Sequence, residues 1–168
     1  MNLEQAYKQV VEFQVFFDFQ MNDITLRKSL IKEETTELLF AKNQIDKLDG
    51  YLDSIYVVLG TFHNLEYGFE NNNPIGYEAE LHDTLINLVL AMEIDFPETN
   101  YDLAFTEVHN SNMSKSCDTL ETVHRTIANR PSENLHHKIH NGKYFVRNEE
   151  NKLIKSIDYK PADLTKFI

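Results

Sequence analysis

The chain has 168 residues and a formal net charge of −11, from 16 Lys and Arg against 27 Asp and Glu. This length is typical of a single domain, and so acidic a chain is repelled by nucleic-acid polymers and by anionic membrane surfaces. The single Cys residue excludes an intramolecular disulfide and favours a reducing compartment. The start of the chain shows no signal-peptide pattern, and no apolar stretch is long enough to span a bilayer. We therefore expect a cytoplasmic protein without a membrane or nucleic-acid partner.

Apolar residues at helical spacing, with few glycines and prolines, predict a mainly α chain. The predicted helices cover residues 3–19, 23–43, 45–66, 78–92, 100–110 and 119–129, with a loop at 71–76. Near the end of the chain, Tyr144–Val146 and Leu153–Ile157 flank a polar turn and predict a β-hairpin. We therefore expect one domain over residues 1–168, an antiparallel helical bundle (1–130) with a small C-terminal β-hairpin arm (141–168).

Several acids fall on the apolar faces of the second and third predicted helices, since helix positions advance by about 100° per residue. On the second helix Glu34 and Glu37 lie within the apolar arc, with Glu33 just beside it. On the third, Asp49 lies at the edge of the apolar stripe, and Asp46 and Asp53 flank it. A solvated acidic face explains this pattern poorly, because unpaired buried carboxylates are unfavourable and like charges at i,i+4 destabilise a helix. A divalent cation with oxygen ligands explains it, and Mg²⁺, with Mn²⁺ as a substitute, suits carboxylates best.

A cation held by carboxylates is a common means of attacking phosphate anhydrides. The hairpin also carries basic side chains, Lys143, Arg147, Lys152 and Lys155, against the acidic charge of the whole chain. These form either a solvated strand or an arm that covers phosphate groups. A triplet of histidines, His136, His137 and His140, offers too few convergent ligands for zinc and is interpreted as an exposed polar stretch.

Four short motifs stand in order along the chain: EExxE at 33–37, DxxD at 46–49, EVHNSNMSK at 107–115 and YxPxDL at 159–164. Together they resemble the MazG-like, all-α NTP pyrophosphohydrolase superfamily, and the last two resemble its phosphoribosyl-ATP pyrophosphohydrolase-like branch. Asp46 stands where that superfamily usually has Glu. The segment 70–101 is longer than the usual link, and its helix would either cover the site or form a subunit interface.

The resemblance implies hydrolysis between the α and β phosphates of a nucleoside triphosphate, giving the monophosphate and pyrophosphate. It implies Mg²⁺ ligands at Glu34, Glu37, Asp46 and Asp49, and places Glu33 and Asp53 beside a second metal or the attacking water as catalytic residues. It also implies that the nucleotide contacts Asn112 and Lys115. Arg27, and Lys143 and Lys155 of the arm, are further candidates for phosphate binding. A homodimer or homotetramer is the assembly that the resemblance implies.

Two alternatives stay beside this hypothesis. One is an enzyme that acts on a single substrate such as dUTP, dCTP or phosphoribosyl-ATP. The other is a protein on the same fold that binds a nucleotide without turning it over. The presence of all six acids favours catalysis, because a protein that only holds a nucleotide has little need of Glu33 and Asp53.

Overall fold

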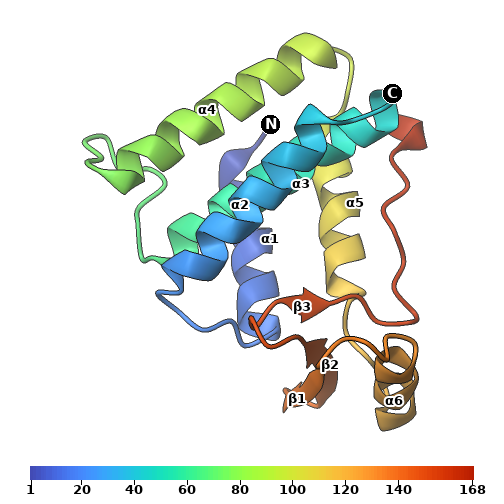
Figure 1. Ribbon diagram of the computed structural model, residues 1–168. Helices are drawn as coiled ribbons and strands as arrows, with labels where there is room; N and C mark the ends of the chain where they lie inside the picture. The colour runs from blue at the N-terminus through green and yellow to red at the C-terminus, as the bar shows by residue number, and fades with distance from the viewer.

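Helices make up most of the computed structural model, which covers residues 1–168, and a small antiparallel sheet follows them (Figure 1). The helices are α1 (Leu3–Phe16), α2 (Ile24–Leu39), α3 (Gln44–Asn64), α4 (Tyr77–Asp95), α5 (Tyr101–Met113) and α6 (Leu120–Ala128). The strands are β1 (His136–His140), β2 (Lys143–Arg147) and β3 (Leu153–Ile154), and a 3₁₀ turn, η1 (Thr165–Phe167), lies near the C-terminus. No helix combines the length and the apolar character needed to cross a lipid bilayer.

The predicted mainly helical fold is confirmed, with shifts at the helix ends. Helix α1 stops at Phe16 rather than at residue 19, and Asp18 adopts a left-handed φ of 51° just beyond it. Helix α2 stops at Leu39 rather than near residue 43, because Asn43 caps the next helix. The Asn43 side chain accepts a hydrogen bond of 2.9 Å from the backbone N–H of Asp46.

The C-terminal sheet has three strands, in the order β1-β2-β3, where the sequence predicted a two-stranded hairpin. The predicted hairpin corresponds to β2 and β3, which pair antiparallel with Arg147 opposite Leu153. Strand β1, which begins at His136, was not predicted, and the sheet therefore starts before residue 141. This strand lies mostly exposed at the sheet edge, and its sequence HHKIH lacks the apolar alternation that reveals a half-buried strand.

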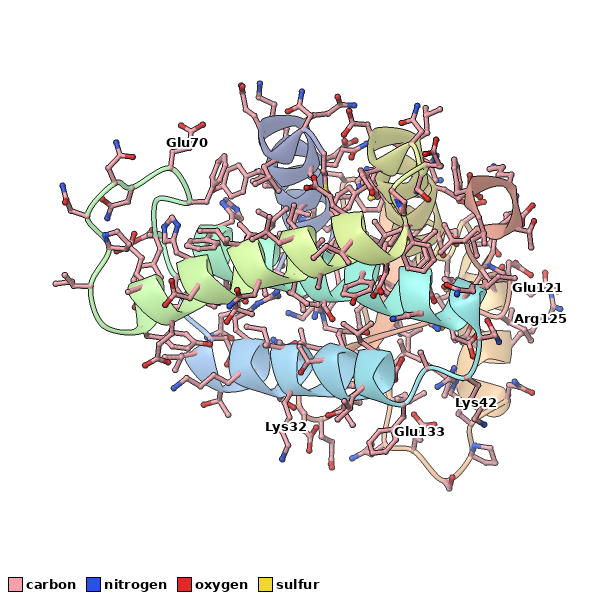
Figure 2. All side chains as sticks on the ribbon, turned by 90° about the horizontal axis from the view of Figure 1, so that it is seen from above. Lys32, Lys42, Glu70, Glu121, Arg125 and Glu133 are labelled. Carbon is pink, nitrogen blue, oxygen red and sulfur yellow. The ribbon has the colours of Figure 1, made fainter.

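Helix α3 lies at the centre of the fold and contacts α1, α2, α4 and α5. Figure 2 shows α4 lying along α3 and, on another side of α3, α2, which packs against it. The main hydrophobic core includes Leu52, Ile55 and Leu59 of α3 together with Phe145 and Leu153 of the sheet. The C-terminal sheet therefore packs on the same core as the helices.

Helices α2 and α3 approach each other closely at Gly50. A Cβ atom at Gly50 would lie 2.8 Å from the Cα and 2.9 Å from the Cβ of Leu38, closer than real side chains pack. Only glycine therefore allows this spacing. Gly50 follows Asp49, and Leu38 follows Glu37, so the close approach brings two of the acidic positions of the chain toward each other.

Arg147 fastens the sheet to the end of α1. Its side chain is fully buried, with one NH2 hydrogen bond of 2.7 Å to the Phe17 carbonyl and another bond from NH1 to the Asn151 carbonyl. Its guanidinium also lies 4.6 Å from the centre of the Phe19 ring. Burial lowers the pKa of Arg147 to about 10, which leaves it charged at neutral pH. Backbone carbonyls and aromatic rings contact this charge directly, and the Asp18 carboxylate stabilises it from beyond ion-pair distance.

We expect Gly50→Ala to destabilise the protein by about 1–3 kcal/mol, the usual range for overpacking, because α2 must move away from α3. Urea unfolding followed by circular dichroism measures this change. Gly68→Ala is the matched control, because the nearest atom to its added Cβ would lie at an ordinary 3.6 Å. Equal stability of the Gly50→Ala and Gly68→Ala variants would contradict the packing argument.

Candidate functional site

A cavity of about 540 Å³ opens between helices α1, α2, α3 and α5 and the C-terminal arm. Nine of the eleven site residues predicted from the sequence line it. They are the acids Glu33, Glu34, Glu37, Asp49 and Asp53, and the donors Arg27, Asn112, Lys115 and Lys155. Residues that lie more than a hundred positions apart in the chain therefore meet at one site.

Two predicted residues, Asp46 and Lys143, do not line this cavity. Asp46 is exposed in the first turn of α3, where its carboxylate accepts a 3.3 Å hydrogen bond from the Lys42 backbone N–H. The ammonium of Lys143 lies 2.5 Å from the Asp118 carboxylate. Lys143 therefore has an anionic partner outside the cavity.

The acidic wall of the cavity comes from two neighbouring helices. Helix α2 contributes Glu33, Glu34 and Glu37, and α3 contributes Asp49 and Asp53. Residues three or four apart share a helix face, so each helix presents its acids together. The close approach of α2 and α3 then brings the two acidic faces to the same cavity.

Burial and mutual repulsion make two of these acids difficult to ionise. Burial, together with the negative charges of Asp53 and Glu37, raises the pKa of Glu34 to about 8. Burial, with the negative charge of Asp49 as the next largest cause, likewise raises the pKa of Asp53 to about 7. Burial also raises the pKa of Asp49. A cation placed among these carboxylates would favour their charged forms.

Lys115, at the end of the EVHNSNMSK motif, lines the same cavity as these acids. Its ammonium donates a 2.5 Å hydrogen bond to the Asn112 side-chain oxygen and lies 5.9 Å from the centre of the Phe13 ring. Burial lowers the pKa of Lys115, whereas the charge of Asp53 acts in the opposite direction. The motif thus brings an amide and an ammonium to the site as donors for an anionic ligand.

The C-terminal segment runs along α5 and holds further residues at the cavity (Figure 1). Ser111 of α5 donates a 2.8 Å hydrogen bond to the Tyr159 hydroxyl, and Glu107 forms a 3.1 Å ion pair with Lys166. Tyr159 lines the cavity, and its ring lies 4.7 Å from the Lys155 ammonium. The two C-terminal sequence motifs therefore contact each other directly in the fold.

Arg27 is buried at the cavity and uses two of its nitrogens to bind α3. Its Nε donates to the Thr61 hydroxyl at 3.2 Å, and its NH2 donates to the Val57 carbonyl at 2.9 Å. Burial lowers its pKa to about 10. Arg27 therefore joins α2 to α3 in addition to lining the cavity.

Sequence reasoning left Gln14 and Tyr56 out of the site, although both line the cavity. The amide nitrogen of Gln14 donates a 2.7 Å hydrogen bond to the Gly60 carbonyl, whereas its buried oxygen has no partner. The Tyr56 hydroxyl lies 3.0 Å from Nδ1 of His109, which is itself buried. Both residues are on the buried faces of their helices, where the sequence pattern indicates only core.

The fit of a metal ion to the acidic wall depends on chemistry and on geometry. The carboxylates are the oxygen ligands that Mg²⁺ and Mn²⁺ prefer, and the raised pKa values of Glu34 and Asp53 show that their charged forms are disfavoured without a cation beside them. No three His, Cys, Asp or Glu side chains, however, are arranged in the structure so that they could hold a metal ion. The donor chemistry fits a divalent cation, and the present side-chain positions do not form a ligand set.

Comparisons with protein-family models, with curated proteins and with solved structures each find no match.

Ionisation of Glu34 is expected to lower the stability of the metal-free protein as the pH rises. Because its pKa is raised from 4.5 to about 8, the folded state retains a proton that the unfolded state releases between these values. Glu34→Gln has no such proton to lose. The variant should therefore become increasingly more stable than the wild type from about pH 5 to about pH 8.

Urea titrations in EDTA at several pH values measure this difference. Asp83→Asn, on the exposed surface of α4, is the control, and its difference from the wild type should stay constant over the same range. A stability difference between Glu34→Gln and the wild type that does not grow with pH would show that Glu34 is not protonated in the folded protein.

Proposed function

We propose that this protein is a Mg²⁺-dependent nucleoside triphosphate pyrophosphohydrolase. It would hydrolyse the anhydride between the α and β phosphates and release a nucleoside monophosphate and pyrophosphate. The observation that carries the proposal is a single cavity lined by five acids of the α2 and α3 pair, by Lys115 just after α5, and by lysines of the C-terminal arm. The motif resemblance of these residues to the MazG-like superfamily supports the same activity.

The arrangement of charge in the cavity suits a nucleotide with its metal ion. A nucleoside triphosphate joins a polyanionic end to a flat aromatic base, and so needs both cationic and apolar partners. Lys115, Lys152 and Lys155 line the cavity as cations. Phe13 and Phe19 supply aromatic surface in the same cavity, with ring centres 5.4 Å apart.

The roles of the acids follow from the proposed reaction. Glu34, Glu37 and Asp49, the cavity acids among the predicted ligands, would hold Mg²⁺, and Mn²⁺ is its chemical substitute. When bound, the ion would neutralise phosphate charge and lower the pKa of a water molecule. Glu33 and Asp53 would orient the attacking water, and Asn112, Lys115 and Lys155 would bind the nucleotide.

Pyrophosphate release from a panel of ribo- and deoxynucleoside triphosphates, with Mg²⁺ present, tests the proposal. The Glu34→Gln/Glu37→Gln variant should lose activity by about 100-fold or more, as happens when a group that stabilises transition-state charge is removed. Glu121→Gln, an exposed residue of α6, is the matched control and should retain wild-type activity. Phosphate release in place of pyrophosphate, or no release from any nucleotide by the folded protein, would contradict the proposal.

We also propose that α4 forms an interface between copies of the chain. None of the residues that line the cavity belongs to this helix, so α4 does not cover the site in the monomer. Its outward face carries Ile86, Leu90 and Ile94, which are 53%, 52% and 80% exposed. Residues spaced by four lie on one helix face, so these side chains form a continuous apolar row. A second copy of the chain would bury this row in a homodimer or homotetramer.

Light scattering after gel filtration tests this interface. The wild type should elute as a dimer or tetramer, and Leu90→Glu should shift it toward the monomer, because a charge in an apolar interface loses its hydration. His124→Glu introduces the same charge on the exposed surface of α6 and should leave the assembly unchanged. A monomeric wild type, or an unchanged Leu90→Glu oligomer, would rule out this face as the interface.

A further inference from the structure

Lys152, in the loop between β2 and β3, binds an acid on the opposite wall of the cavity. Its ammonium lies 2.5 Å from one carboxylate oxygen of Glu33 and 2.6 Å from the other. The two residues are 119 positions apart in the sequence, and both side chains are only partly exposed, at 37% and 38%. Glu33 is therefore neutralised by the arm in the ligand-free protein.

The backbone of Lys152 is fixed by its own loop. Its N–H donates a 2.8 Å hydrogen bond to the Asn148 side chain, and its carbonyl accepts a 3.1 Å bond from the Asn148 N–H. Asn151 precedes it with a left-handed φ of 64°, and the Asn151 carbonyl accepts a hydrogen bond from the buried Arg147. The loop is thereby tied to the core, and a change of partner at Lys152 needs only rotation of its side chain.

The three lysines that line the cavity differ in their partners. The ammonium of Lys115 binds an amide oxygen, and that of Lys155 lies over an aromatic ring. Lys152 is the one that forms an ion pair with a cavity acid. An incoming polyphosphate carries several negative charges into the same cavity and competes with Glu33 for this ammonium, since lysine binds phosphate as a mobile point charge.

We propose that Lys152 exchanges partners: it holds Glu33 in the ligand-free protein and binds the polyphosphate of the substrate once that ligand enters, which releases Glu33. The inference rests on the proposed function for the identity of its substrate. It assigns a phosphate-binding role to a residue of the β2–β3 loop and links that binding to the availability of Glu33. The carboxylate proposed to orient water would then be free only when a substrate is present.

A double-mutant cycle on the binding of inorganic tripolyphosphate tests the exchange. Calorimetric titrations in EDTA compare the wild type, Lys152→Met, Glu33→Gln and the double variant. Lys152→Met should weaken binding roughly tenfold, the effect of losing a charge-assisted hydrogen bond. Glu33→Gln should strengthen binding severalfold, because Lys152 no longer has a competing partner. In the Lys152→Met background, Glu33→Gln should bring a much smaller gain, whereas a general charge effect would bring the same gain in both backgrounds.

Lys138→Met, on the exposed edge strand β1, is the matched control and should bind tripolyphosphate as the wild type does. Thermal unfolding of each variant verifies that it is folded. The exchange is overturned if Lys152→Met binds as tightly as the wild type, if the gain from Glu33→Gln is equal in both backgrounds, or if no variant binds.

Pyrophosphate release from nucleoside triphosphates is measured separately from the binding cycle. If no nucleotide is hydrolysed while the cycle shows the interaction, the proposed function fails and the exchange of partners stands. If nucleotides are hydrolysed and the cycle shows no interaction, the exchange alone fails. The two proposals therefore have distinct outcomes.

Discussion

Carboxylates from α2 and α3 share one cavity, and their burial beside one another raises the pKa of both Glu34 and Asp53. A fold with this arrangement must supply positive charge to the same place or keep protons on the acids. The structure does so from distant parts of the chain, with Lys115 at the end of α5 and Lys152 in the arm. The acidic pair of helices and the C-terminal arm thus depend on each other: the arm neutralises charge that the helices bury.

The sequence predicts features that depend on residues close together in the chain, and it misses contacts between residues far apart. Glu34 and Glu37 were placed on a common face correctly, because helix geometry relates residues three apart. The ion pair between Glu33 and Lys152 spans 119 positions, and no periodicity relates them. Asp46 follows the predicted motif spacing. Asn43, however, caps α3 just before it, so Asp46 lies in the first turn of the helix and does not line the cavity. Strand β1 was missed because an exposed edge strand needs no apolar alternation.

Arg147 shows how the arm gains a fixed position without a carboxylate partner. The last carbonyls of a helix lack internal hydrogen-bond partners and carry partial negative charge. The guanidinium binds the Phe17 carbonyl directly after α1 and, through the Asn151 carbonyl, also holds the loop that carries Lys152. The buried Arg147 side chain thereby connects the end of α1 to the loop that positions Lys152 at the cavity. From the sequence, Arg147 is predicted only to be one of the basic residues of the hairpin.

The lysines of the cavity and the negative net charge of the whole chain act differently on the rate at which an anionic ligand associates. The whole chain carries a net charge of −11, so a free nucleotide experiences repulsion at long range, and the lysines of the cavity act on it only at close approach. Dissolved salt screens charges separated by more than the Debye length, about 10 Å at 0.1 M ionic strength, more than it screens close contacts. Moderate ionic strength would thus accelerate the encounter with an anionic ligand, whereas most charge-steered binding sites are slowed by it.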